Sequence, residues 1–142
     1  MKVKDAMTVD VQVARPADTI QSVARQMSEL DTGVMPVCDG TRVQGIITDR
    51  DIAIRVVAEG GDINAPVSQY MTEDVEYAYE SDDLDKVAKR MGDLQIRRMI
   101  VVDSNKDLAG IISLGDFARE GKAKTVGAVL EDISEPGDEP AR

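Results

Sequence analysis

The chain contains the stretch Gly45-Ile46-Ile47-Thr48-Asp49-Arg50-Asp51, and it repeats the pattern as Gly110-Ile111-Ile112-Ser113-Leu114-Gly115-Asp116. In each stretch a glycine and two isoleucines complete a strand, a hydroxyl residue stands at the turn, and a carboxylate follows in the first turn of a helix. The similarity extends outward, because the opening Met7-Thr8 is matched by Met71-Thr72. A repeat of this length indicates two copies of one small unit, so any binding site should exist in two related versions.

Each copy is expected to fold as β-α-β-β-α. In the first copy Ile20, Val23 and Met27 recur at helical spacing, and Asp18 or Thr19 is placed to cap that helix. The elements predicted for the first copy are 11–13, 20–30, 34–38, 43–48 and 49–58, and those for the second are 75–79, 84–91, 99–102, 108–113 and a helix from 114 onward.

Segments outside these elements have simpler predictions. Asn64 could cap a short helix that runs through Met71, and residues 125–130 suggest one or two helical turns. The acidic stretch 131–142 contains two prolines and a glycine, which favours a frayed tail. The predicted divisions are therefore 1–60 for repeat 1, 61–121 for repeat 2, and 122–142 for a short helical segment with a flexible tail.

The chain has 142 residues, so each copy alone is too small to bury a generous core. We therefore expect the copies to share one core around a pseudo-twofold axis. In that arrangement the helical stripe Ile20/Val23/Met27 would face the stripe Leu84/Val87/Met91.

Composition excludes several classes of protein. A net charge of −10 and an aromatic content of 3% argue against binding of nucleic acid, which needs cations and stacking side chains. The start of the chain resembles no signal peptide, and no apolar run reaches membrane-spanning length. Cys38 is the single cysteine, so a reducing cytoplasmic location is expected.

The paired hydroxyl and carboxylate of each repeated stretch suggest a ligand that carries both phosphate and sugar. A helix N-terminus and a hydroxyl favour phosphate oxygens, whereas a carboxylate only accepts hydrogen bonds and suits ribose hydroxyls. The same spacing is also a plain helix-capping arrangement, and that alternative stays open here.

Other site chemistry has little support in the sequence. The chain has no histidine and one cysteine, so no metal site is expected. No Ser/His/Asp or Cys/His set can be assembled, so nucleophilic catalysis is not expected either. An enzyme that uses two carboxylates with Mg²⁺ on a nucleotide remains a minor alternative.

The chain resembles the CBS-domain family, whose paired repeats are called Bateman modules. The resemblance rests on the two Met-Thr openings, the strands Met35-Pro36-Val37 and Met99-Ile100-Val101, and the two glycine-to-aspartate stretches, and it covers about residues 1–121. It implies a mixed α/β (α+β) fold of tandem CBS repeats, of the stand-alone bacterial or archaeal type.

The resemblance also implies two ligand clefts between the repeats, each completed by the opposite copy. Asp51 with Thr48 would serve one cleft, and Asp116 with Ser113 the other. The residues expected at the first cleft are Ile46, Thr48, Arg50, Asp51, Val75, Glu76, Ile96, Arg97 and Arg98. Those expected at the second are Val11, Gln12, Thr32, Gly33, Val34, Ile111, Ser113 and Asp116.

The two clefts are not expected to be equal. Arg97-Arg98 stands where the first copy has Gly33-Val34, and Arg50 stands where the second copy has Gly115. Charge-assisted bonds to these cations would make the first cleft the stronger site for an anionic ligand. The alternative for Arg97-Arg98 is a solvated basic edge.

These features predict a non-catalytic sensor that binds an adenine nucleotide (AMP, ADP or ATP), S-adenosylmethionine or an NAD-type molecule, and that requires no cofactor. It would act as a homodimer, without nucleic acid or membrane, and transmit its ligand state to a regulated partner protein. The alternative is a structural or oligomerising CBS module without a physiological ligand.

Overall fold

The computed structural model describes residues 1–120 and 123–134, with side chains omitted at 123–125. The chain divides into two units that cross the predicted repeat boundaries. The N-repeat unit is Gln12–Val75, and the C-repeat unit joins Met1–Val11 to the chain from Glu76 onward. Each unit therefore contains one whole strand–helix stretch.

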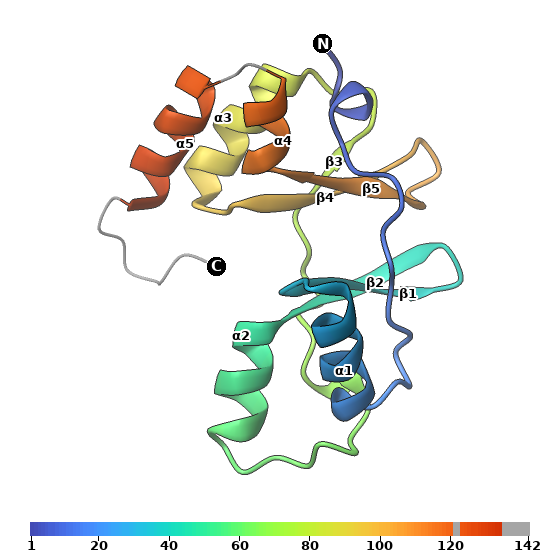
Figure 1. Cartoon of the computed structure of the whole chain (residues 1–142). Helices are drawn as coiled ribbons and strands as arrows, with labels where there is room; N and C mark the ends of the chain where they lie inside the picture. Colours follow the sequence, from blue (N-terminus) through green and yellow to red (C-terminus); the bar gives the residue numbers. More distant parts are fainter. Residues whose placement is uncertain (121–122, 135–142) are drawn as a thin grey trace. The chain divides into compact units, whose positions relative to one another are not determined.

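In the N-repeat unit, two helices lie on one face of a two-stranded antiparallel sheet (Figure 1). Thr19 caps the first helix as predicted, since its side chain accepts a hydrogen bond from the Ser22 N–H. The second helix begins as an α-helix and continues with π-helical turns. The elements are α1 (Ile20–Leu30), β1 (Val34–Asp39), β2 (Arg42–Thr48), α2 (Asp49–Asp51) with its continuation η2 (Ile52–Val57), and the 3-10 turn η3 (Val67–Gln69).

In the C-repeat unit, α3, α4 and α5 cover one face of a three-stranded sheet (Figure 1). The sheet order is β3-β4-β5, with β3 parallel to β4 and β4 antiparallel to β5. The elements are η1 (Val3–Asp5), β3 (Tyr77–Tyr79), α3 (Leu84–Leu94), β4 (Arg98–Val102), β5 (Leu108–Ser113), α4 (Leu114–Arg119) and α5 (Ala123–Ser134). The mixed α/β fold is confirmed, and the C-repeat unit has the full β-α-β-β-α order.

Each copy's opening segment pairs with the strand that precedes the other copy's strand–helix junction. Thr8 and Ile111 exchange backbone hydrogen bonds of 2.9 and 3.0 Å, so the N-terminal stretch lies beside β5 (Figure 1). Thr72 and Ile46 exchange two bonds of 2.9 Å in the same way. This exchange is the reason why the units do not follow the order of the repeats.

The glycines that open the two stretches make this pairing possible. A Cβ on Gly45 would lie 2.7 Å from the Thr72 carbonyl oxygen, and one on Gly110 would lie 2.4 Å from that of Thr8. Real Cβ atoms do not approach backbone this closely, so the opening segments can pair only beside glycine.

The prediction of a strand at 11–13 is wrong, because the chain forms only one parallel bridge next to this stretch, between Ala14 and Val37. The matching β3 continues its ladder one step further, where the Glu80 N–H donates to the Val102 carbonyl at 2.9 Å. The first copy has Pro16 at the position of Glu80, and proline has no N–H with which to extend the ladder.

The prediction that the two helical stripes face each other is also wrong, because each stripe is buried in the core of its own unit. Ile20, Val23 and Met27 are buried in a cluster within the N-repeat unit. Leu84, Val87 and Met91 are buried in a separate cluster within the C-repeat unit. Each helix packs onto its own sheet, and the exchanged opening segments add Val67 to the first cluster and Val3 to the second.

The C-terminal helix is longer than predicted. α5 extends to Ser134, so residues 131–134, predicted as a frayed tail, are helical. Val129 and Ile133 are buried in the core of the C-repeat unit, which stabilises this extension. The remaining tail, 135–142, lies outside the described residues. Within the described part of the chain, no helix is long and apolar enough to cross a membrane.

Candidate functional site

The junction of the N-repeat unit, Thr48 to Asp51, is a reciprocal capping box. The Thr48 N–H donates to Asp51 Oδ2 at 3.0 Å, and the Thr48 hydroxyl accepts from the Asp51 N–H at 3.1 Å. The Asp51 side chain is buried and lies 3.7 Å from Nε of Arg55, measured at Oδ1. The hydroxyl of Thr48 uses an oxygen lone pair in the cap, so its hydrogen remains a donor.

The junction of the C-repeat unit, Ser113 to Asp116, differs in how the hydroxyl is used. Both the N–H and the hydroxyl of Ser113 donate to Asp116 Oδ2, at 2.8 and 3.1 Å. Asp116 Oδ1 accepts from Arg119, which lies one helical turn further on. Both carboxylate oxygens therefore have partners, and the Ser113 hydrogen is used within the protein.

Asp51 and Asp116 share an unusual degree of burial. Among the described residues they are the two buried polar or charged side chains, with exposed fractions of 7% and 2%. Aspartate is seldom buried unless it is paired or bonded, and both carboxylates are. The capping alternative is thus confirmed as part of what these residues do.

A second segment of each copy lies against its own junction. The Gly33 carbonyl accepts from the Asp49 N–H at 2.9 Å, and the Arg97 carbonyl accepts from the Leu114 N–H at 3.2 Å. A Cβ on Gly33 would lie 2.7 Å from Asp49 Oδ2, so glycine leaves room for that carboxylate. At the matching positions of the other copy, Arg97 replaces Gly33 and Leu114 replaces Asp49.

The predicted site residues therefore group within units as follows. The N-repeat unit brings the backbone of 32–34 beside its own junction, since Val34 pairs with Thr48 in the β1–β2 register. The C-repeat unit brings 96–98 beside its junction, since Arg98 pairs with Ser113. In the sequence-based prediction, these neighbours are divided between the two clefts. That division pairs residues of one unit with residues of the other and stays a prediction.

The remaining predicted residues lie in several settings. Ile46 and Ile111 are half-buried on β2 and β5, where they carry the pairing with the opening segments. Glu76 is exposed and forms an ion pair of 2.9 Å with Arg90. Val11 and Val75, near the ends of the two units, are half-buried, as is Ile96 just before β4. Gln12 is exposed.

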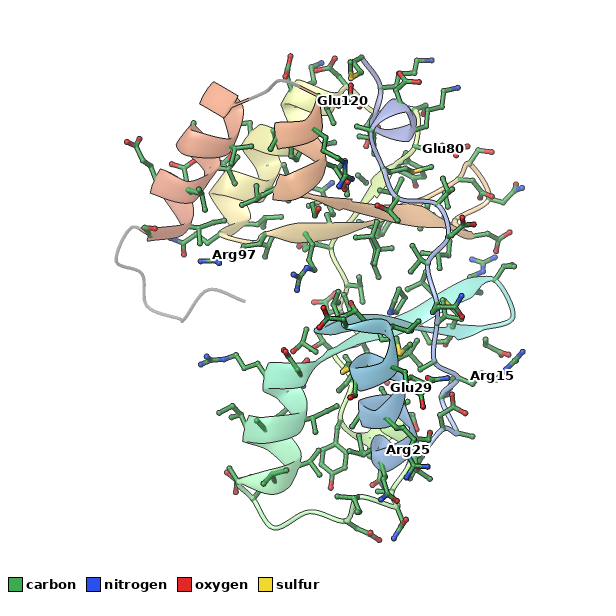
Figure 2. The ribbon with its side chains drawn as sticks, in the orientation of Figure 1. Arg15, Arg25, Glu29, Glu80, Arg97 and Glu120 are labelled. Atoms are coloured by element: carbon green, nitrogen blue, oxygen red, sulfur yellow. The ribbon has the colours of Figure 1, made fainter. Side chains whose placement is uncertain are left out.

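The predicted cations are all exposed. Arg50 lies on α2, Arg98 begins β4, and Arg97 precedes it. Figure 2 shows the Arg97 side chain extending from the sheet away from α3, α4 and α5. None of the three has an ion-pair partner within 4.0 Å among the described residues. Their charge is therefore available to an anion in solution.

Sequence reasoning missed Arg55 and Arg119. Each follows its carboxylate by one helical turn, at the i+4 or i+3 position, and that spacing was the readable signal. Arg55 also donates from Nη1 to the Tyr70 carbonyl at 3.1 Å. Because Tyr70 comes from a distant turn, this second contact had no signal in the local pattern.

The CBS domain family model matches this chain twice, over residues 3–58 and 67–122. The chain belongs to the CBS-domain family. The CBS domain-containing protein YhcV of Bacillus subtilis is 38% identical over 133 residues, which cover 93% of this chain and 94% of YhcV. Each of the two regions matched by the CBS model contains one of the complete strand–helix junctions described above.

Two solved structures are similar to this chain in sequence and fold. The CBS domain pair of protein MJ0100, in complex with 5-methylthioadenosine and S-adenosyl-L-methionine, is 27% identical with a TM-score of 0.75, and the match covers 87% of this chain and 98% of that one. Hypoxic Response Protein I, solved with two coordinated zinc ions, is 30% identical with a TM-score of 0.76, and the match covers 84% of this chain and 98% of that one.

Zinc binding finds no counterpart in the part of this chain that the structure describes. It contains no group of three or more His, Cys, Asp or Glu side chains that could hold a metal ion. The sequence has no histidine, and its one cysteine, Cys38, is buried in β1.

Proposed function

We propose that this CBS protein is a non-catalytic sensor that binds an adenosyl ligand, with Asp51 and Asp116 accepting hydrogen bonds from the ribose. The observation that carries the proposal is their burial: the two buried charged side chains of the described chain stand at the two repeat-related junctions. A carboxylate next to a hydroxyl suits a ligand that has both sugar and phosphate or a similar polar group. The adenosyl complexes of the MJ0100 domain pair support this ligand class.

The two junctions should differ in ligand preference. Thr48 keeps its hydroxyl hydrogen as a donor, whereas Ser113 uses its own on Asp116. Asp116 is also held by Arg119, so a ribose there would compete with an existing charge-assisted bond. We therefore propose that Asp51 is the main ribose-binding carboxylate, and Asp116 the weaker one.

The cations Arg50, Arg97 and Arg98 would select for a phosphate-bearing ligand such as AMP, ADP or ATP. They are exposed and without ion-pair partners among the described residues, in a chain whose net charge is −10. These cations would attract an anion to a protein that is otherwise acidic. An uncharged ligand such as adenosine would gain nothing from them.

The proposed mode of action is regulatory. The protein would work in the cytoplasm as a homodimer, and a partner protein would respond to the ligand-bound state. Ligand binding changes an output only when it favours one conformation over another. The absence of histidine from the sequence supports a binding role rather than the usual acid–base chemistry.

A structural CBS module without a physiological ligand is the second candidate. It is favoured by one observation, namely that both carboxylates already cap helices and contact arginines. If capping were their whole role, neither would need to bind ribose.

Calorimetric titration with AMP, adenosine, 5-methylthioadenosine and S-adenosylmethionine separates the candidates. Asp51→Asn, which keeps a capping oxygen, should weaken binding by about ten- to a hundredfold, and Asp116→Asn by less. Arg97→Ala with Arg98→Ala should weaken AMP much more than adenosine. No binding of any of these ligands by the unaltered protein would favour the structural module, and a larger loss from Asp116→Asn would reverse the order of the two sites.

A further inference from the structure

Arg55 contacts two parts of the N-repeat unit that are distant in sequence. Its Nε lies 3.7 Å from Asp51 Oδ1, and its Nη1 donates to the Tyr70 carbonyl at 3.1 Å. A planar guanidinium can hold both partners at once, because its donors point in fixed, divergent directions. One side chain thus connects the candidate ribose carboxylate with the turn that ends η3.

Tyr70 is itself well fixed. Its N–H donates to the Val67 carbonyl at 2.9 Å, and its ring packs against the core of the N-repeat unit. Its hydroxyl lies beside Gly61, where an added Cβ would come within 2.7 Å of it. A movement of the Tyr70 carbonyl must therefore be taken up by the residues that follow it, up to Thr72.

These contacts form a closed ring around the junction. From Tyr70 the chain reaches Thr72, which exchanges its two 2.9 Å hydrogen bonds with Ile46 on β2. Two residues after Ile46 comes Thr48, which is capped with Asp51, and Asp51 contacts Arg55. The links are hydrogen bonds, one ion pair and two short stretches of backbone, all within the N-repeat unit.

The C-repeat unit lacks the closing link. Thr8 and Ile111 pair as Thr72 and Ile46 do, and Ser113 bonds to Asp116. Arg119, however, bonds to Asp116 and to no backbone carbonyl among the described residues. The two units therefore differ in whether an arginine connects the carboxylate to the opening segment.

We propose that Arg55 is a positioning residue that couples ligand binding at Asp51 to the segment Tyr70–Thr72, near the C-terminal end of the N-repeat unit. This inference rests on the proposed function for its ligand. Ribose hydroxyls that donate to Asp51 would draw its charge away from Arg55. The hydrogen bond from Arg55 to the Tyr70 carbonyl would then weaken. As a result, the Thr72–Ile46 pairing would open more often.

Amide hydrogen exchange tests the link in the protein without ligand. Asp51→Asn should speed exchange at the amides of Thr72 and Ile46 by about fivefold, the effect of one weakened hydrogen bond. In an Arg55→Gln background, Asp51→Asn should produce almost no further increase in exchange, because the link through Arg55 is already absent. Arg55→Lys keeps a positive charge near Asp51 but lacks the divergent donors of the guanidinium, so it should behave like Arg55→Gln. Additive effects of the Asp51 and Arg55 changes would overturn the inference.

The matched control is the pair Asp116→Asn and Arg119→Gln, observed at the amides of Thr8 and Ile111. Because no arginine links that carboxylate to its opening segment, the two changes should show no coupling at these amides. Equal coupling in both units would mean that loss of stability, not the Arg55 bridge, is being measured.

The ligand arm uses 5-methylthioadenosine. It should speed exchange at Thr72 in the unaltered protein and leave it unchanged in Arg55→Gln, while calorimetry shows that this variant still binds. Binding with the same Thr72 response in both proteins would overturn the inference and leave the proposed function intact. Failure of the unaltered protein to bind would instead contradict the proposed function, and the ligand-free arm would still decide the role of Arg55.

Discussion

The two units are built from copies of one pattern, yet their helical layers differ. In the C-repeat unit, α5 adds Val129 and Ile133 to the buried cluster, and Gln95 at the end of α3 donates to the Asp132 carbonyl at 2.8 Å. The N-repeat unit has no matching helix within Gln12–Val75, and its second helix widens into π-helical turns. Two copies of one sequence pattern therefore do not bury the same amount of apolar surface. The difference arises because α5, which lies outside the repeat, adds apolar side chains to the core of one unit only.

The largest expected difference in stability between the two units concerns the residue that follows each buried aspartate. Phe117 is fully buried in the C-repeat unit, whereas Ile52, at the same position of the other copy, is half-buried. Phe117→Ala should lower the free energy of unfolding by about 3–5 kcal/mol, and Ile52→Ala by about 1–2 kcal/mol. Urea unfolding of both variants measures this difference. Similar losses would mean that the two cores are equally well packed.

The next test concerns the close approach of the opening segments. Gly110→Ala would place a Cβ 2.4 Å from the Thr8 carbonyl oxygen, and Gly45→Ala would place one 2.7 Å from that of Thr72. Both should destabilise the protein by about 1–3 kcal/mol, with Gly110→Ala the more damaging.

Thermal unfolding checks this order. Gly127→Ala on α5 is the control, since nothing lies within 4 Å of its Cβ and alanine is the better helix former. A stability of Gly45→Ala or Gly110→Ala equal to that of the control would contradict the exchanged pairing.

The smallest expected effect is a loss of folding stability at alkaline pH, and it arises within the N-repeat unit. Burial raises the pKa of the Cys38 thiol above its ordinary value of 9.0. The folded protein thus holds this proton to a higher pH than the unfolded chain does. Its contribution to stability is complete below about pH 9 and is lost as pH rises through the folded pKa.

Urea unfolding across this alkaline range should therefore show a steeper loss for the unaltered protein than for Cys38→Ala. Equal slopes would show that Cys38 titrates alike in the folded and unfolded chains.

Much of the fold was readable because its signals are local. The stripe of Ile20, Val23 and Met27 predicts a helix wherever that helix packs, and the glycine-to-aspartate stretch predicts a strand that turns into a helix. The failed strand at 11–13 was also a local matter, since Pro16 cannot extend the ladder. The capping box at each junction was among the alternatives that the sequence left open.

The sequence by itself determined the two copies, their element order, and the two carboxylates that became the buried charges of the described chain. The tertiary structure alone decided that each copy's opening segment pairs with the other copy, and that the two helical stripes lie in separate cores. It also decided that Arg55 reaches Tyr70. The physical reason is that periodicity and capping depend on neighbours in sequence, whereas the exchange of Thr8 and Thr72 depends on which free strand edge and which glycine a distant segment meets.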